Sequence, residues 1–518
     1  MNTPAAPRPR RLVRFLVFGA VGMLLAGCAE PPATPDWTPP PWNDRPGTRL
    51  AATTVDDTTD LNDLGFVNRR IRNDAIGYQA RYVLIPGADQ FNQRVDQWIR
   101  QPLTGATFVP EAFPVGSGLA DRGCAEGSLG WDANRVLTDP ATGPVNGTGT
   151  ALTCDIVAAF GTTVGVGMRA VSGTNGEADS DEMTTLYVDL ATDTIIDSVD
   201  LWTPEAPAQL WTSAVEQLRR QAGGLSTAPI EAPADDQIAL AAQAFTNPRG
   251  QSDGSAVLVL PAGISAPELT GLGIEQTTEP VEVSVEAAVL TEWQSPAAAA
   301  LSSQQGEPFA GMPEWSPTLP IDCSLHSCVA LTYDDGPGQL TPQLLETLKA
   351  RQAGATFFEL CTNVKANPEI TKQVGASGYE LASHTMTHPQ LTSLSAEKVD
   401  AEVNGCANMI AGLTGKPVTL FRPPYGAVNA EVISAAGKPA IFWSIDTNDW
   451  QRPGVAALIE RSVPTATPGD IILFHDIHPD SVAAAGQVVD GLKDRGLTPV
   501  SVTQLFNGSV PAGLVIKK

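Results

Sequence analysis

Two adjacent acidic residues lie in the stretch LTYDDGPGQL, residues 331–340. Asp334 and Asp335 end an apolar run and directly precede a glycine and a proline. Neighbouring carboxylates repel each other and add little to the stability of a fold, so the pair suggests a chemical role. One carboxylate could bind a cation while the other takes a proton.

Two of the five histidines in the chain lie close together in SHTMTHP, residues 383–389. His384 and His388 are four residues apart, so one helical turn would place both imidazoles on the same face. Two histidines and one carboxylate are a common ligand set for a catalytic divalent cation that keeps open coordination positions. The sequence therefore predicts a metal centre that uses one of the two aspartates.

The elements that must position these residues follow a regular pattern after Cys323. Short apolar runs alternate with amphipathic stretches, which predicts parallel strands joined by crossover helices. Seven units favour an α/β fold with a (β/α) barrel, complete or distorted, whose functional residues sit at the carboxyl ends of strands. The expected strands are VALTY, GATFFEL, YELAS, VTLFRPP, AIFWSID, DIILFH and LTPVSV.

Five motifs in this region occur in a fixed order: TYDDGP (332–337), SHTMTHP (383–389), RPPYG (422–426), DTNDW (446–450) and LFHD (473–476). With these motifs, residues 322–508 resemble the polysaccharide deacetylases with a NodB homology domain, carbohydrate esterase family 4. Tyr333 stands where that family usually has phenylalanine. The resemblance implies a metal-dependent hydrolase that removes N-acetyl groups from amino sugars and releases acetate.

The same resemblance implies roles for the acidic pair and the histidine pair. Asp335, His384 and His388 would hold a divalent metal, for which zinc is the expected ion because it suits imidazole and carboxylate ligands. Asp334 would be the general base that takes a proton from the attacking water. By this resemblance, Asp335 is the aspartate expected to bind the cation.

The remaining motifs would supply the acid, the oxyanion donor and the acetyl pocket. His475 is the candidate general acid, because imidazole titrates near neutral pH and the leaving amine needs a proton. Asp449 would orient His475, although Asp446 could compete for that role. Arg422 would pair with Asp334, and the backbone N–H of Tyr425 would stabilise the oxyanion. The residues expected to line the acetyl pocket are Trp450 and Leu473.

The N-terminus predicts export. Four arginines precede FLVFGAVGMLLAG (15–27), which is short for a membrane span. The segment ends in LLAGC and resembles a bacterial lipobox, so residues 1–27 are expected to be a signal peptide and Cys28 the lipidated residue. The predicted location is the outer face of the cytoplasmic membrane. An ordinary secretory signal with a chance cysteine is the alternative.

Six cysteines remain after Cys28. An even number in an exported chain predicts three disulfides, and six cysteines allow about 15 connectivities. Nearness in sequence favours Cys124–Cys154, Cys323–Cys328 and Cys361–Cys406. Free core thiols at Cys361 and Cys406 are an alternative, and the lack of a CxxC pair argues against a cysteine metal site.

The rest of the chain divides into two linkers and a middle region. Residues 28–50 and 296–320 are expected linkers, 51–295 an α+β domain, and 321–510 the catalytic domain. In the middle region, residues 89–103 predict an amphipathic helix and residues 184–202 two strands. VEVSVEAAVL predicts a further strand. This region has no histidine and no carboxylate cluster, so a binding, sensing or spacer role is expected. It resembles a domain of unknown function that precedes the catalytic domain of some bacterial wall deacetylases.

The net charge of the chain and its expected lipid anchor limit which binding partners and substrates are expected. The 518 residues carry a net charge of −25, which argues against nucleic acid as a partner. A lipid anchor would keep the enzyme near peptidoglycan, so the predicted function is peptidoglycan N-deacetylation, with cell-wall glycan as the substrate. A chitooligosaccharide deacetylase or an O-acetyl polysaccharide esterase is the alternative within the family. The alternative that is not an enzyme is a sensor lipoprotein that binds the cell wall or lysozyme and has an inactive barrel.

Overall fold

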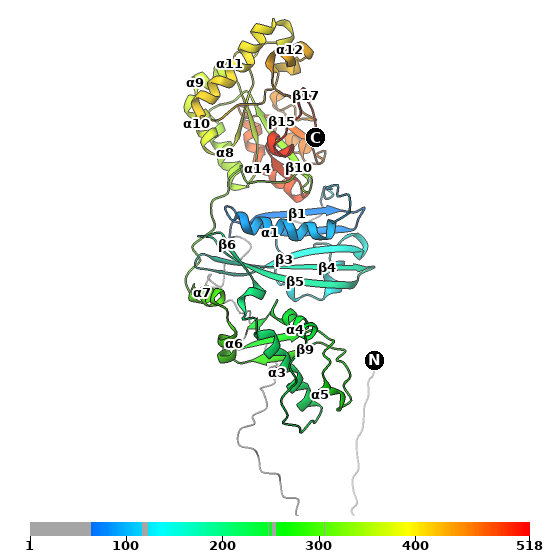
Figure 1. The fold of residues 1–518 in the computed structure, drawn as a ribbon. Helices are drawn as coiled ribbons and strands as arrows, with labels where there is room; N and C mark the ends of the chain where they lie inside the picture. The colour runs from blue at the N-terminus through cyan, green and yellow to red at the C-terminus, as the bar shows by residue number, and fades with distance from the viewer. Residues whose placement is uncertain (1–63, 117–122, 247, 251–254, 305) are drawn as a thin grey trace, which may run out of the picture. The chain divides into compact units, whose positions relative to one another are not determined.

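The computed structural model describes residues 64–116, 123–246, 248–250, 255–304 and 306–518 (Figure 1). The expected signal peptide, the lipidation site Cys28 and the proline-rich linker 28–50 lie outside the described residues. Within the described ranges, no helix is both long enough and apolar enough to cross a membrane.

The first part of the middle region is built on a six-stranded sheet with the order β1-β2-β3-β4-β5-β6. Helix α1 (Asp89–Arg100) buries Phe91, Val95, Trp98 and Ile99 in the core of this part, which confirms the predicted amphipathic helix. The two strands expected in residues 184–202 are also present, as β5 and β6. The strands are β1 (Val67–Asn73), β2 (Tyr78–Leu84), β3 (Gly149–Phe160), β4 (Thr163–Thr174), β5 (Glu177–Asp189) and β6 (Thr194–Asp197), and the short helix α2 spans Ala133–Thr138.

The second part of the middle region has its own small sheet, of order β7-β8-β9, and its own hydrophobic core. The predicted strand VEVSVEAAVL is only half right. Alternating Val281, Val283 and Val285 form β9, but the following residues lose the alternation and form helix α6. The elements are α3 (Ala206–Gln221), α4 (Asp235–Ala242), β7 (Arg249–Gly250), β8 (Ala256–Leu260), α5 (Pro267–Thr270), β9 (Val281–Val285) and α6 (Ala287–Trp293). Helix α7 (Pro296–Gln304) follows, so the expected linker 296–320 begins as a helix.

The C-terminal domain is centred on strand β10 (Cys328–Asp334), which pairs in parallel with β11 and β15. The strand order is β12-β11-β10-β15-β14, and β16 also pairs with the start of β10. All these pairings are parallel, as the strand–helix alternation predicted. The other strands are β11 (Thr356–Glu359), β12 (Glu380–Ser383), β13 (Ala440–Ile441), β14 (Ile445–Asp446), β15 (Ile471–His475), β16 (Thr498–Val500) and β17 (Leu514–Val515).

Single bridges close these strands into a ring. Ser383 at the end of β12 bridges to Phe421, and Phe421 bridges to Ala440. The run 440–446 then reaches β15, because its last residues form β14. The predicted distorted (β/α) barrel is therefore present. The expected strand VTLFRPP contributes only Phe421 to these bridges, since the prolines that follow lack an N–H to donate.

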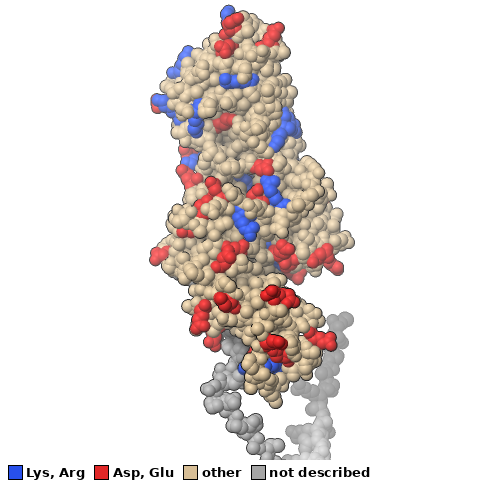
Figure 2. Space-filling view, viewed as in Figure 1, with Lys and Arg blue, Asp and Glu red and all other residues tan. Residues whose placement is uncertain are grey.

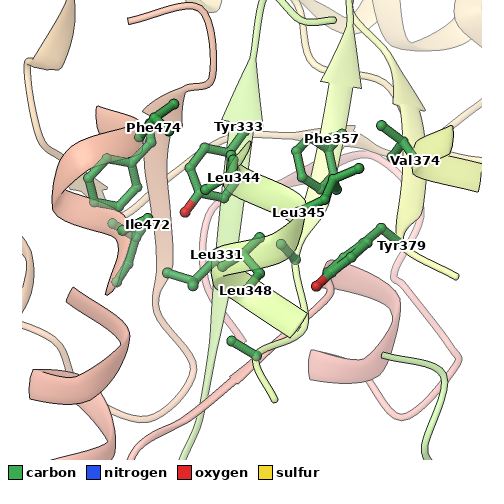
Figure 3. Packing of buried hydrophobic residues seen from close by; sticks show 14 of the residues in the cluster. Leu331, Tyr333, Leu344, Leu345, Leu348, Phe357, Val374, Tyr379, Ile472 and Phe474 are labelled. Atoms are coloured by element: carbon green, nitrogen blue, oxygen red, sulfur yellow. The ribbon is translucent and has the colours of Figure 1, made fainter. Parts of the chain in front are cut away.

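Helices surround this ring (Figure 1). On β10, Leu331 and Tyr333 point toward helix α8, and the Tyr333 ring stacks between Phe357 and Phe474 of the neighbouring strands (Figure 3). Because side chains alternate along a strand, Asp334 faces the other way. The apolar layer therefore fixes the strand end that carries the acidic pair. The helices are α8 (Thr341–Ala350), α9 (Cys361–Ala366), α10 (Pro368–Ala376), α11 (Ala396–Thr414), α12 (Ala430–Ala436), α13 (Val455–Ser462), α14 (Pro479–Asp494) and α15 (Val502–Leu505).

The three predicted disulfides are confirmed: Cys124–Cys154, Cys323–Cys328 and Cys361–Cys406. The alternative of free thiols at Cys361 and Cys406 is therefore wrong. The last bridge joins α9 to α11, two helices whose preceding strands both lead into the site.

Candidate active site

The acidic pair divides at the end of β10. Asp334 is the last residue of the strand and only 3% exposed, and its Oδ1 accepts a hydrogen bond of 2.7 Å from Nη1 of Arg422. Asp335 follows with a φ of 67°, a left-handed conformation that turns its side chain away from the strand direction. Asn363 holds this turn, since its Nδ2 donates to the backbone oxygen of Asp335 at 2.7 Å. The two neighbouring carboxylates thus face different surroundings.

The partner of Asp334 is a fully buried arginine inside the ring. Arg422 donates from Nη1 to Thr332 Oγ1 (2.8 Å), from Nε to the oxygen of Ile441 (3.0 Å) and from Nη2 to the oxygen of Phe442 (2.9 Å). Burial lowers the pKa of Arg422, and the contact with Asp334 opposes that effect. The charged guanidinium is the donor in each of these hydrogen bonds. It therefore links the segment that carries Arg422 to β10 and to residues 441–442.

Asp335, His384 and His388 form a cluster whose ligand atoms all lie within 4.8 Å of one another. Oδ1 of Asp335 is 3.5 Å from Nε2 of His384 and 3.4 Å from Nε2 of His388. Nδ1 of His384 donates to the backbone oxygen of Arg422 at 2.8 Å, which orients the ring so that Nε2 faces Asp335. Burial and the neighbouring His384 lower the pKa of His388, which favours its neutral form.

The donor set fits a divalent cation. Oδ1 of Asp335 is buried and has no hydrogen-bond partner among the described residues, although two imidazole nitrogens face it. A buried carboxylate oxygen without a donor is costly unless a cation neutralises it. The two histidines are not on one helical turn, as the spacing suggested: His384 follows β12, and a non-helical turn leads to His388.

His475 ends β15, the strand beside β10, and is bound to Asp449. Nδ1 of His475 lies 2.7 Å from Oδ1 of Asp449, and the backbone N–H of His475 donates to Oδ2 at 2.6 Å. Burial alone would lower the pKa of His475, but the hydrogen bond to Asp449 and the charge of Asp334 outweigh it and raise the pKa to about 9. Asp446 does not compete, since it is exposed and accepts from the N–H of Asn448.

The proposed oxyanion and pocket residues lie at different depths. Tyr425 has a φ of 59° and is 75% exposed, with its ring 4.7 Å from that of His388. Trp450 is 57% exposed and directly follows Asp449, whereas Leu473 is buried in β15. The Tyr425 ring therefore lies against His388 of the Asp335–His384–His388 cluster, whereas Trp450 is adjacent to Asp449 in sequence only.

Several contacts were not predicted from the sequence. Ser481 donates to Oδ2 of Asp449 at 2.5 Å from the first turn of α14, a position that carries no motif. Asp476, the last residue of the fifth motif, accepts from Oγ1 of Thr341 at 2.5 Å, and burial raises its pKa to about 7. The ring of His478 lies 5.5 Å from that of His475, and His326 is buried, with its pKa lowered to about 4 by that burial.

Comparisons with known proteins match the same C-terminal segment that carries the five motifs. The polysaccharide deacetylase family profile matches residues 322–440. The peptidoglycan-N-acetylglucosamine deacetylase PgdA of Listeria monocytogenes is 37% identical over 186 residues, which are 36% of this chain and 40% of PgdA. The peptidoglycan-N-acetylmuramic acid deacetylase PdaC of Bacillus subtilis is 36% identical over 178 residues, 34% of this chain and 38% of PdaC. The chain therefore covers less than half the length of these two relatives.

A shorter relative is covered almost completely. A peptidoglycan-N-acetylglucosamine deacetylase of Bacillus cereus is 37% identical over 187 residues, which are 34% of this chain and 87% of that enzyme. The matched part of the chain is the domain that contains the ring, the Asp335–His384–His388 cluster and the His475–Asp449 pair. Through this C-terminal domain, the chain belongs to the polysaccharide deacetylase family.

Proposed function

We propose that the chain is a metal-dependent N-deacetylase that removes acetyl groups from amino sugars of cell-wall glycan. The observation that supports this most is the meeting of three groups at the carboxyl ends of neighbouring parallel strands. They are the Asp335–His384–His388 cluster, the Asp334–Arg422 pair and the His475–Asp449 pair. Together they offer a cation site, a proton acceptor and a proton donor, which is what amide hydrolysis needs.

A divalent cation, for which zinc suits the ligand types, would supply Lewis acidity at Asp335, His384 and His388. The chain's own groups account for the proton transfers. Arg422 occupies Oδ1 of Asp334, so Oδ2 is the atom placed to take the proton of the attacking water. Nδ1 of His475 is bound to Asp449, so Nε2 is the atom placed to protonate the leaving nitrogen. The C–N bond then breaks to give acetate and a free amine.

The oxyanion that forms during attack needs a donor besides the cation. The backbone N–H of Tyr425 is proposed for this role, and the left-handed conformation of Tyr425 beside His388 supports it. Trp450 and Leu473 are proposed to contact the acetyl methyl group. Leu473 is buried on β15 two residues before His475, and the exposed Trp450 directly follows Asp449 in the sequence.

The proposed place of action is the outer face of the cytoplasmic membrane, with Cys28 as the lipidated residue and peptidoglycan as the substrate within reach. Cys28→Ala is expected to release the protein from the membrane fraction or to stall its export. Fractionation of cells that express the two forms measures this. Unchanged membrane association of Cys28→Ala would show that another segment is the anchor.

The test of the activity is acetate release from purified peptidoglycan by the zinc-loaded full chain, with Asp334→Asn as the matched control. Metal-dependent release that the control lacks would support the proposal, and analysis of the treated glycan would identify the sugar that lost its acetyl group. Chitooligosaccharides and acetylated xylan are assayed in parallel. Release from one of these but not from peptidoglycan would favour the alternative substrates, and no release from any would favour a binding or sensing role.

A further inference from the structure

We infer that Glu402 is a positioning residue for the metal centre: its carboxylate holds the turn between His384 and His388 in the shape that points His388 at Asp335. Glu402 lies in the middle of α11, outside all five motifs. The inference rests on the proposed binding of a cation by Asp335, His384 and His388. It adds a residue that does not touch the cation but sets the geometry of one of its ligands.

The turn needs outside support because of its backbone. Thr385 and His388 have φ values of 74° and 63°, and both carry a side chain. Residues other than glycine rarely adopt this left-handed region, and they keep it only where neighbouring groups determine the conformation. The backbone N–H of His388 donates to Oγ1 of Thr385 at 3.0 Å, which is the turn's own contribution.

Glu402 supplies three contacts to the two residues at the tip of the turn. Its Oε2 accepts from the backbone N–H of Met386 at 2.9 Å and from that of Thr387 at 2.9 Å. Its Oε1 accepts from Oγ1 of Thr387 at 2.7 Å. Successive N–H groups that converge on one anion form a compact anion-binding arrangement, and hydrogen bonds to a charged acceptor are stronger than neutral ones.

The helix that carries Glu402 is itself fixed to the site. Oγ of Ser383, at the end of β12, donates to the backbone oxygen of Val403 at 2.9 Å. One turn after Glu402, Cys406 is bonded to Cys361 at the start of α9. Side chains that set a metal ligand do so best from such a rigid element. Loss of the Glu402 carboxylate would therefore free the turn, and His388 Nε2 would no longer be held 3.4 Å from Asp335 Oδ1.

The test compares Glu402→Gln with the wild type in the full chain. The amide has nearly the same shape, but it loses the charge and replaces one acceptor oxygen with a donor. The zinc dissociation constant, measured by competition with a chelator, is expected to rise roughly 10-fold to 100-fold, as is usual when a group behind a metal ligand is lost. The absorption spectrum of the cobalt-substituted protein should change as well, because it reports ligand geometry.

Glu397→Gln is the matched control, since Glu397 lies on the same helix and is exposed. It should leave the zinc affinity and the cobalt spectrum unchanged. Thr387→Val is the second variant, in case Glu402→Gln folds poorly. Thr387 is exposed, and removing its hydroxyl deletes only one of the three contacts, so a smaller loss of zinc affinity is expected.

The outcomes separate this inference from the proposed function. If the wild type and His388→Ala bind zinc equally, the cation does not use this cluster and the proposed function fails. If His388→Ala loses zinc but Glu402→Gln binds it as tightly as the wild type, the inference is overturned and the proposed function stands. A Glu402→Gln protein whose metal-free melting temperature falls while its zinc affinity stays the same would also overturn it, since the role would then be structural only.

Discussion

At the scale of single residues, the two aspartates differ in what their carboxylates contact. Asp334 receives a charged hydrogen bond from Arg422, whereas Oδ1 of Asp335 receives none from the described residues and faces two imidazoles. The surroundings of the two adjacent aspartates thus suit different proposed roles, a proton acceptor for Asp334 and a cation ligand for Asp335. The left-handed backbone of Asp335 is what separates them.

This difference predicts opposite behaviour of two conservative variants. Asp334→Asn should keep its zinc but release acetate at least about 100-fold more slowly, because an amide cannot take the proton of the attacking water. Asp335→Asn should lose zinc, because it removes the only charged ligand. Metal content after dialysis and acetate release measure the two effects. Equal loss of metal in both variants would show that the roles within the pair are assigned wrongly.

The His475–Asp449 pair predicts the alkaline limit of activity. The pKa of His475 is raised to about 9, so its protonated, acid form is present below that pH and lost as the pH rises through it. Asp449→Asn removes the negative charge that opposes the effect of burial, so the alkaline limb of kcat/KM should move to lower pH. Asp446→Asn is the control and should leave the limb in place, since Asp446 does not contact His475. A limb unchanged in Asp449→Asn would mean that another group sets it.

At the scale of elements, the sequence predicted the strands that are continuous apolar runs, such as β10 and β15. It did not predict how the ring closes. AIFWSID was expected to be one strand, but its two ends pair with different neighbours, Phe421 and β15, and such pairing depends on residues far away in the chain. The motif residues of the site were recognisable because five motifs occur in the order typical of the polysaccharide deacetylase family. Ser481 and Glu402 were not, since nothing distinguishes them from other helix residues until the fold brings them to Asp449 and the histidine turn.

The two disulfides of the C-terminal domain should differ in their effect on stability. Cys361–Cys406 closes a loop with a sequence separation of 45 residues, and in the chain-entropy account such a loop stabilises by about 4 kcal/mol. Cys323–Cys328, with a separation of 5, should stabilise by about 2 kcal/mol. Urea unfolding of the two double-serine variants measures this. Equal losses in the free energy of unfolding would contradict the prediction.

At the scale of the whole molecule, charge is divided unequally along the chain. Residues 321–518 contain 14 basic and 19 acidic residues, whereas residues 51–295 contain 12 basic and 33 acidic ones. On the face shown in Figure 2, acidic side chains predominate over the part built on β7 to β9. The middle region therefore offers no electrostatic attraction to an anionic polymer. If it binds wall glycan, neutral contacts must account for the affinity, and added salt should not weaken it.

The proposed division of labour predicts the behaviour of a fragment that spans residues 315–518. Every residue assigned to the site lies within it, and so do both disulfides of the C-terminal domain. The fragment should fold, keep its metal and deacetylate short N-acetylglucosamine oligomers as fast as the full chain. It should be slower mainly on intact wall, where a second binding domain would raise the effective concentration of the first.

The comparison to make is the ratio of the rates of fragment and full chain on the two substrates. A folded, metal-loaded fragment that is inactive on oligomers would show that the middle region completes the active site. An equal ratio on both substrates would assign the middle region a sensing or spacer role instead of wall binding.

The pairing of β10 with β15 brings together proposed ligands and a proposed acid that lie far apart in the sequence. The ribosome delivers the N-terminal end first, so Asp335, His384 and His388 are all available well before His475 is synthesised. Yet β10 acquires its neighbour β15 only after some 140 further residues, because Thr332 pairs with Leu473 and Asp334 with His475. A chain truncated before His475 would thus keep the proposed cation ligands but lack its acid. Hydrolysis is therefore expected only of chains that extend past His475.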